Sequence, residues 1–421
     1  MSILRVARWS LAGTVLIAHS AWPQGVPDGP EFRVNTYTTG AQYFARAAAD
    51  SLGAFVVTWN SQLQDGSLSG VFAQRYADSG APVGPELRVN TYTTGSQLFP
   101  AVAADPSGSF VIVWGSLDQD GSSWGVFGQR YSGSGSPLGT EFRVNASTTG
   151  AQGNPGVAVD SAGNFVVVWS SAGQDGSVTG IFGQRYASSG VPVGPEFRVN
   201  AYTTGPQDLP AVASAPSGDF VVVWRSMNQD GSGYGIFGQR YAAAGVPLGP
   251  EFQVNTFTGN QQLYSQVAVD STGAFVVVWA SYAQDGSIFG IFGQRFASSG
   301  APAGPEFPVN TFTTGLQTRP SVAADTAGNF VVAWDNSGFG SAAYWIAGQR
   351  YSASGAPSGT EFRINTYTGG HKGYPSVACD PVTGNFVVVW QNDVQDGSLD
   401  GVFGQRYSQI VPVDLMHFRV D

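Results

Sequence analysis

The sequence predicts an all-β fold, a seven-bladed β-propeller. Three observations predict it: a 55-residue period, four short strand-like segments in each unit, and no window with helical periodicity after the N-terminal leader. Repeated four-stranded antiparallel sheets are typical of propellers, because each blade buries its faces against its neighbours and closure of the ring protects the sheet edges.

The period is set by a tetrapeptide, E-[FL]-x-[VI], that recurs every 55 residues. It begins at Glu31, Glu86, Glu141, Glu196, Glu251, Glu306 and Glu361. A degraded eighth copy occupies residues 417–421. Seven units supply 28 strands and one extra copy of the E-F-R-V-N strand, and the sequence shows no distinct end caps, so we expect one closed ring and not an open solenoid.

Each unit contains four strand signals separated by turns rich in Gly, Ser, Asp and Pro. In the third unit they are 156–160 (GVAVD), 164–169 (NFVVVW), 180–186 (GIFGQRY) and 196–200 (EFRVN). The second segment is apolar at consecutive positions, as expected of a strand buried on both faces.

The order of the strands from axis to rim follows from a resemblance. The segment P-x-V-A-x-D, followed by a Gly turn and an apolar strand, resembles the opening of the NHL type of propeller blade, whose first strand is innermost. This phase places residues 31–35 as the outer strand of the last blade, where they close the ring. Residues 417–420 compete for that place, but the first copy keeps the Glu and Asn of the repeat, so we expect the N-terminal strand.

Residues 1–21 are predicted to be a signal peptide. Arg5 and Arg8 precede an apolar stretch at 10–18, and small residues follow at Ser20 and Ala21. About 20 apolar residues are needed to span a bilayer, so this stretch is too short to be an anchor. We expect residues 22–421 to form a single propeller domain that is secreted, extracellular or periplasmic.

The composition excludes several classes of partner and site. Only 11% of residues are charged, the net charge is −10 and Lys372 is the one lysine, which argues against nucleic acid and anionic membranes as partners. Cys379 is the single cysteine, so there is no internal disulfide framework and no cysteine-based zinc motif. We expect a monomer without membrane insertion.

Residues that recur in every unit are predicted to be scaffold. A Trp ends the second strand of each unit, and we expect the seven to pack between blades: Trp59, Trp114, Trp169, Trp224, Trp279, Trp334 and Trp390. A Gln-Arg pair recurs in the third strand, and the Glu or the strand-end Asp of each unit is the expected partner of its Arg.

The Q-D-G-S string of the loop between strands two and three predicts a turn. Calcium is a minor alternative, because most copies offer one carboxylate and calcium takes six to eight oxygens. We therefore expect no cofactor.

A localised site is expected where the units differ, on one face of the disc. The residue five positions before the Gln of the third strand is aromatic in four units, at Trp124, Tyr234, Phe289 and Tyr344. A Gln recurs in the loop between units, with Lys372 in its place in the last unit, and two variable residues follow it. These pairs are Tyr43-Phe44, Leu98-Phe99, Gly153-Asn154, Asp208-Leu209, Leu263-Tyr264, Thr318-Arg319 and Gly373-Tyr374.

Three arginines after the leader fall outside the repeat pattern, at Arg46, Arg225 and Arg319, and map to the same face. With Trp124, Tyr234, Phe289, Tyr344, Lys372 and Tyr374 they are the candidate ligand-binding residues. Exposed aromatic residues with scattered amides and charges suit carbohydrate or protein recognition, although aromatic residues that pack over loop backbones give the same pattern.

The whole repeat, FVVVW-x-S-x-x-Q-D-G-S-x-x-G-I-F-G-Q-R-Y with E-F-R-V-N-T-Y-T-T-G, resembles tandem repeats of secreted or surface bacterial proteins, often found beside RTX or cadherin-like modules. The blade count and loop placement also resemble FG-GAP propellers, whose calcium loop this chain lacks.

No catalytic constellation stands out among the repeats. The sequence therefore favours a non-enzymatic module that binds an extracellular glycan or protein through its loop face. The alternative is a propeller glycoside hydrolase or lyase with a site at the central channel, similar to sialidases, which grip a carboxylate with three Arg.

Overall fold

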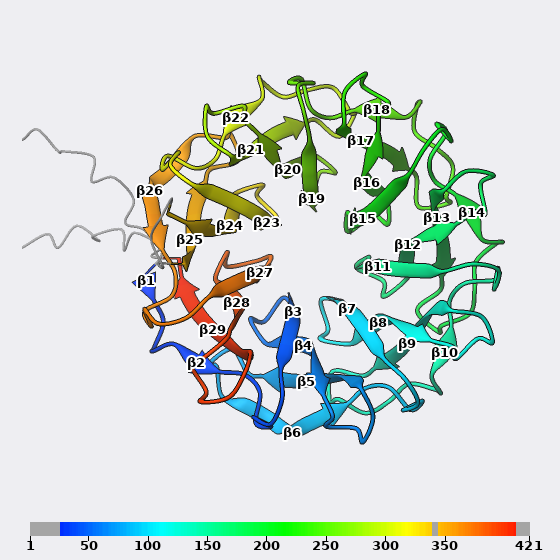
Figure 1. Cartoon of the computed structure of the whole chain (residues 1–421), viewed down its shortest axis with the longest axis vertical. Coiled ribbons are helices and arrows are strands. Elements are labelled where there is room, and N and C mark those ends of the chain that lie inside the picture. The colour runs from blue at the N-terminus through cyan, green and yellow to red at the C-terminus, as the bar shows by residue number, and fades with distance from the viewer. Residues whose placement is uncertain (1–25, 339–343, 410–421) are drawn as a thin grey trace, which may run out of the picture.

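The computed structural model describes residues 26–338 and 344–409, which form seven blades around a central channel (Figure 1). The predicted signal peptide, the eighth repeat copy at 417–421 and most of the blade-six loop between strands two and three lie outside these residues. The described part contains no helix that is long and apolar enough to cross a membrane.

Each blade is an antiparallel sheet whose strands follow one another from axis to rim, so the predicted fold and strand order are confirmed. Blade one comprises β3 (Gln42–Ala49), β4 (Phe55–Gln62), β5 (Ser69–Tyr76) and β6 (Pro82–Arg88). Blade two comprises β7 (Gln97–Ala104), β8 (Phe110–Leu117), β9 (Trp124–Tyr131) and β10 (Phe142–Arg143). Blade three comprises β11 (Gln152–Val159), β12 (Phe165–Ala172), β13 (Thr179–Tyr186) and β14 (Phe197–Arg198).

The remaining blades repeat this arrangement. Blade four comprises β15 (Gln207–Ser214), β16 (Phe220–Met227), β17 (Tyr234–Tyr241) and β18 (Phe252–Gln253). Blade five comprises β19 (Gln262–Val269), β20 (Phe275–Tyr282), β21 (Phe289–Phe296) and β22 (Phe307–Pro308). Blade six comprises β23 (Leu316–Ala324), β24 (Phe330–Ser337), β25 (Tyr344–Tyr351) and β26 (Pro357–Arg363). Blade seven comprises β27 (Lys372–Cys379), β28 (Phe386–Asn392) and β29 (Gly401–Ser408).

The N-terminal segment completes blade seven. β1 (Val26–Pro27) and β2 (Phe32–Arg33) both pair antiparallel with β29, with Phe32 opposite Gly404. Gln395 and Val402 of blade seven then bond to Glu31 and Asn35 as their counterparts do in the other blades. The strand that we expected to close the ring from the sequence is therefore the one that does so.

The core consists of seven interfaces between neighbouring blades. Trp169 of blade three is fully buried and packs against Val111 and Val113 of blade two. All seven repeat Trp have no exposed surface, which confirms the predicted packing role.

The repeat Arg and Glu have different partners from those predicted. Arg185 Nη1 donates to the Ala243 carbonyl oxygen of the next blade at 2.9 Å, not to an acid of its own unit. Glu196 Oε2 instead accepts the Ala146 amide of the preceding blade, and Glu196 Oε1 accepts the Gln174 amide. Both side chains therefore tie neighbouring blades together, and the Arg is satisfied by backbone oxygens.

Candidate functional site at the channel mouth

Each inner strand begins earlier than predicted because it contains a β-bulge. Two of its residues oppose the single Trp of the second strand, as Phe44 and Ala45 do opposite Trp59. The first bulge residue lies at positive φ in all seven blades, with φ between 49° and 58°: Phe44, Phe99, Asn154, Leu209, Tyr264, Arg319 and Tyr374. We call these seven residues the mouth ring, because they stand where the inner strands surround one end of the channel.

The backbone of the mouth ring is strained in every blade. A left-handed backbone is unfavourable for Phe, Tyr, Leu and Arg and costs about 1–3 kcal/mol at a strained site. The bulge recurs in every blade, yet its first residue changes from blade to blade and is never Gly. Bulges of this kind re-aim side chains, and such strain is concentrated at functional sites.

In four blades the residue after the Trp supports the mouth ring of the next blade; Gly115, Arg225 and Ala280 have no side-chain acceptor at this position. The amide of Phe99 donates to Asn60 Oδ1 at 3.1 Å, that of Leu209 to Ser170 Oγ at 3.2 Å, and that of Phe44 to Gln391 Oε1 at 3.2 Å. In blade six this supporting residue is Asp335, whose carboxylate accepts the Tyr374 amide. This position varies between the units, and the candidate residues from the sequence include it only in blade four, at Arg225.

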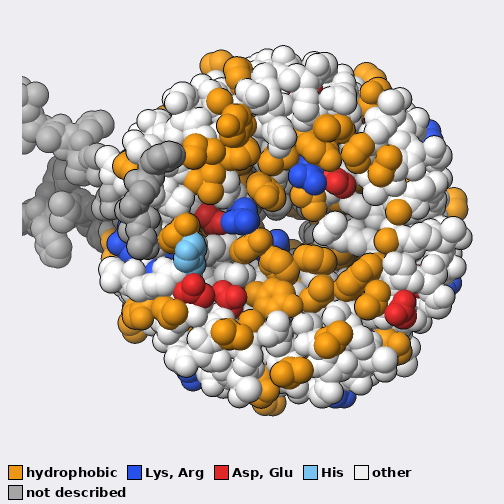
Figure 2. All heavy atoms as spheres, in the orientation of Figure 1, with side chains coloured by type: hydrophobic (Ala, Val, Ile, Leu, Met, Phe, Trp, Pro, Cys, Tyr) orange, Lys and Arg blue, Asp and Glu red, His pale blue; other side chains and the backbone are white. Residues whose placement is uncertain are grey.

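A hollow of about 240 Å³ opens between blades six and seven on this face. We call it the six–seven pocket. Arg319 and Asp335 line it from blade six, and Tyr374, Gln391 and Asp400 line it from blade seven. In Figure 2 basic and acidic side chains lie beside the central opening, together with hydrophobic side chains along its rim.

Asp335 is the buried carboxylate of this pocket. Burial raises its pKa from 3.8 to about 7, and Arg319, whose Nη1 lies 2.8 Å from Asp335 Oδ2, only partly offsets the increase. Asp335 Oδ1 is buried and has no hydrogen-bond partner among the described residues. The Nε1 atoms of the seven repeat Trp are also buried without a partner in the described part of the chain, so this oxygen alone does not mark a site. What distinguishes Asp335 is an ionisable group in the wall of the pocket.

Asp400 is the second carboxylate of the pocket. Burial raises its pKa, and the nearby Asp393 raises it further, while the Gln391 side chain donates to Asp400 Oδ1 at 3.2 Å. Asp400 occupies the position that is aromatic in four other blades. Two carboxylates with raised pKa values in one hollow are an arrangement suited to general acid–base chemistry.

Two of the three unmatched arginines already have carboxylate partners. Arg225 forms a two-point ion pair with Asp208 and lies 4.4 Å from the ring centre of Tyr234. Arg319 is paired with Asp335 and lies 4.1 Å from the ring centre of Tyr374. The sequence therefore selected residues of the right face, but the three do not act as one unpaired grip for a carboxylate.

Arg46 lies deeper, on the inner strand of blade one. Its Nη1 donates to the Ala45 carbonyl oxygen at 2.9 Å, and no acidic side chain pairs with it among the described residues. Burial lowers its pKa, and the effect of Tyr374 partly opposes this. Tyr374 is thus a neighbour of both Arg46 and Arg319.

The remaining candidates divide into pocket and scaffold residues. The Tyr344 ring contacts the His371 ring, with centres 3.5 Å apart, and both residues line the six–seven pocket. Trp124 instead lies over Gly115 of its own blade, where an added Cβ would meet the indole at 3.4 Å. Phe289 packs edge-on against Tyr282 at 5.1 Å, at the margin of the core between blades five and six.

Lys372 lines the six–seven pocket and also holds the loop that precedes it. It is 3% exposed, and its Nζ donates to the carbonyl oxygens of Gly369 and Gly370. The repeat Gln that it replaces makes the same kind of contact, as Gln207 does with Thr204 and Gly205. The assignment of Lys372 to ligand binding therefore stays a prediction, because the residue lines the six–seven pocket while the backbone occupies its ammonium.

The Q-D-G-S loops form the predicted turns. Asp175 Oδ1 accepts the Ser177 amide at 3.0 Å, and Asp175 Oδ2 accepts the Asn200 side chain at 3.1 Å. Both carboxylate oxygens are thus engaged within the blade. Among the described residues no three His, Cys, Asp or Glu side chains are grouped so as to hold a metal ion.

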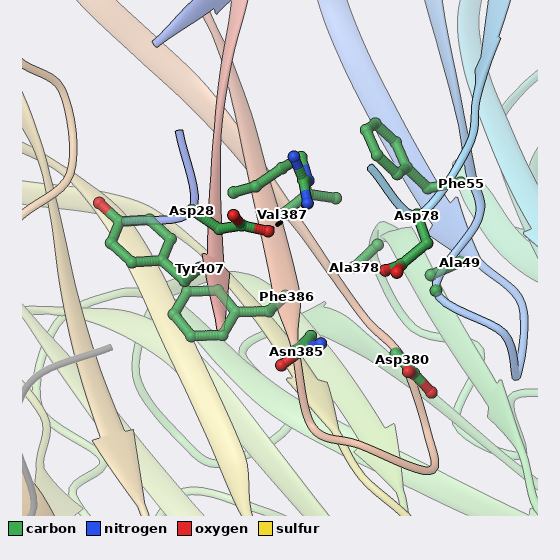
Figure 3. A pocket seen from close by; sticks show the side chains of 12 residues that line it. Asp28, Ala49, Phe55, Asp78, Ala378, Asp380, Asn385, Phe386, Val387 and Tyr407 are labelled. Atoms are coloured by element: carbon green, nitrogen blue, oxygen red, sulfur yellow. Dashed lines mark hydrogen bonds and ion pairs between the residues drawn. The ribbon is translucent and has the colours of Figure 1, made fainter. Parts of the chain in front are cut away.

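The opposite face has a different kind of pocket, shown in Figure 3. It lies between blades seven and one, where Asp28 forms an ion pair with Arg406 beside Asp78 and Asp380. Its volume of about 20 Å³ suits one water molecule. It therefore has room for a structural water and not for a sugar ring.

No model of a known protein family matches the sequence, and no protein of curated function matches it. Solved structures do share the fold. A protein of unknown function from Dyadobacter fermentans matches with a TM-score of 0.51 and 11% identity over 92% of this chain and 99% of that one. The α-L-arabinofuranosidase Arb93A from Fusarium graminearum, in complex with an iminosugar inhibitor, matches with a TM-score of 0.50 and 12% identity over 90% and 98%. NanB with Optactamide matches with a TM-score of 0.50 and 8% identity over 89% and 70%.

These likenesses establish the fold, and they correct the main functional expectation from the sequence. We expected a non-enzymatic binding module because the blades are nearly equivalent and no catalytic constellation stood out. A structure of the same fold is a glycosidase with an inhibitor bound, so this fold accommodates glycosidase activity. The six–seven pocket also breaks the equivalence of the blades, which favours the alternative of an enzyme with its site at the channel.

Proposed function

We propose that this chain is an exported glycoside hydrolase that acts on a polysaccharide in the six–seven pocket. The observation that carries the proposal is the buried Asp335, whose pKa is raised to about 7 in a hollow that also contains Asp400. The export rests on the predicted signal peptide. The similar glycosidase structure supports only the statement that this fold can carry glycosidase activity. The catalytic residues are chosen from the lining of the six–seven pocket.

Glycoside hydrolysis commonly requires one carboxylic acid that donates a proton and one carboxylate that attacks the sugar or activates water. Asp335 suits the first role, because a pKa near 7 keeps about half of it protonated at neutral pH. Arg319 holds Oδ2, and Oδ1 has no hydrogen-bond partner among the described residues. Because Oδ1 is buried behind the pocket wall, Asp335 must turn toward the pocket to protonate a glycosidic oxygen in this scheme.

Asp400 suits the second role in its ionised form. The Gln391 side chain holds Asp400 Oδ1, which fixes the carboxylate in the pocket wall. Arg319 has a further function in this scheme: once Asp335 has given up its proton, the guanidinium stabilises the carboxylate that remains. Tyr344 and Tyr374 provide aromatic surface for the sugar ring.

The test is hydrolysis of a panel containing arabinan, xylan and galactan, with the 4-nitrophenyl glycosides of the same sugars. Asp335→Asn removes the proton donor at nearly constant volume, and we expect kcat to fall about 10²- to 10⁴-fold. Asp208→Asn is the matched control, because it breaks the Arg–Asp pair of blade four on the same face. We expect it to keep activity near the wild-type level.

Asp400→Asn should also lose activity, and thermal melting of all three variants separates loss of chemistry from loss of folding. The proposal is overturned if the wild-type protein hydrolyses none of these substrates, or if Asp335→Asn is as active as the wild type.

A further inference from the structure

Three aromatic residues of the mouth ring form a continuous surface over blades seven, one and two. The ring centre of Phe44 lies 4.8 Å from that of Tyr374 and 5.1 Å from that of Phe99. We call these three residues the aromatic platform. Phe99 is 38% exposed, and Phe44 and Tyr374 are half-buried, so the platform faces the solvent at the channel mouth.

The fold does not require aromatic residues at these positions. Blades three and four carry Asn154 and Leu209 at the equivalent points, with the same bulge and φ values of 52° for both. The platform rings contact one another across blades seven, one and two, but blades three and four keep the same bulge without such rings. Ring contact with a ligand is a function that explains why bulky rings occupy these strained positions.

The platform is continuous with the six–seven pocket. Tyr374 belongs to both, and Arg319 lies 4.1 Å from its ring centre on the pocket side. Gln391 is a second connection, because its Oε1 accepts the Phe44 amide while its Nε2 donates to Asp400. A chain that enters the pocket therefore has an apolar surface beside it, in the direction of blades one and two.

We propose that the aromatic platform is a subsite that binds further sugar units of the substrate, so that the enzyme prefers a glycan chain to a single terminal sugar. This inference rests on the proposed glycosidase function and adds the substrate class. The C–H faces of pyranose and furanose rings are apolar and pack on aromatic side chains, which makes this exposed group of tilted rings suitable for a sugar chain.

The platform is tested by removing its rings. Phe44→Ala with Phe99→Ala should lower kcat/KM on the polysaccharide about tenfold and leave the 4-nitrophenyl monosaccharide nearly unchanged. Leu209→Ala is the matched control, because it truncates the same mouth-ring position on blade four. Phe44→Asn gives a second variant, since Asn tolerates the left-handed backbone and folding should be retained.

Binding is measured separately, by retardation in native gels that contain arabinan, xylan or galactan. The wild-type protein and Leu209→Ala should be retarded, and the platform variants should not. Retardation that depends on the platform without any hydrolysis refutes the glycosidase and supports the sugar subsite. The proposal that the platform binds sugar units is overturned if all variants show equal retardation and equal kcat/KM. It is also overturned if no polysaccharide retards the wild-type protein, and the platform is then better interpreted as a protein-binding surface.

Discussion

The junction between blades six and seven and the junction between blades three and four share a backbone and differ in chemistry. In the first, Asp335 accepts the amide of Tyr374, and in the second, Ser170 accepts the amide of Leu209. The hydrogen bond that supports the mouth ring is thus kept while the supporting group changes from a hydroxyl to a buried carboxylate. The residue after the Trp can support the mouth ring, and in blade six it also places a carboxylate in the pocket. Because the blades repeat, comparison of one blade with another separates these two roles.

The largest expected effect is on the free energy of unfolding and concerns the buried Trp that both junctions contain. Trp390 packs on blade six and Trp224 packs on blade three, and both are fully buried. Replacement of either by Ala should cost about 3–5 kcal/mol of unfolding free energy, measured by denaturant titration, because each leaves an equivalent cavity. A much larger cost for Trp224→Ala than for Trp390→Ala would contradict the equivalence of the two interfaces.

The second prediction concerns the buried carboxylate Asp335, which distinguishes the junction of blades six and seven from that of blades three and four. Because Asp335 must be protonated to act as an acid, hydrolysis should fall about tenfold per pH unit well above pH 7, where this carboxyl is ionised. Activity should also fall on acidification as Asp400, whose pKa is raised, becomes protonated. A kcat/KM profile that stays flat from pH 6 to 9 would contradict the assignment of Asp335.

The same pKa shift has a consequence for stability, and its sign is opposite to that of an ordinary ion-paired Asp. The unfolded chain releases this proton near the ordinary pKa of 3.8 and the folded protein near 7. This group therefore lowers the free energy of unfolding as pH rises through that window. Asp335→Asn should remove this contribution, and melting curves between pH 4 and 8 check it.

The smallest expected effect concerns Lys372, which replaces the Gln of the repeat but makes the same kind of contact with the backbone. Lys372→Gln restores the residue that the other blades use, so we expect a change in unfolding free energy within about 0.5 kcal/mol and unchanged hydrolysis. Lysine and glutamine both satisfy the carbonyl oxygens of the preceding loop. A loss of activity in this variant would support the prediction that Lys372 binds ligand.

The repeated features of the fold could be predicted from the sequence. The 55-residue period determined the blades, and the retained Glu31 and Asn35 correctly indicated which strand closes the ring. The variable positions placed Arg319 and Tyr374 on the right face. The pairing of Arg185 with an acid was wrong, because backbone oxygens of the next blade become available to it only in the folded ring.

The two carboxylates of the site were missed for a related reason. Asp335 and Asp400 are 65 residues apart and belong to different blades, so neither position is marked as part of a pair in the sequence. The bulge that creates the mouth ring was also missed, because a left-handed Phe or Tyr has no signature of its own in the sequence. The variable position after each Trp is the signal that would have identified Asp335.

The pairing of β2 with β29 makes the aromatic platform a late product of folding. The two strands are separated by almost the whole described chain, and contacts between such distant segments form slowly because a long loop must close first. Phe44 follows β2 closely, whereas Asp400 precedes β29, and Gln391 connects the two. Phe44 of the aromatic platform therefore meets Tyr374 and Gln391 only when the first and last repeats come together, whereas the six–seven pocket is built from two consecutive blades. In the proposed scheme, binding of a glycan chain by the platform depends on closure of the ring.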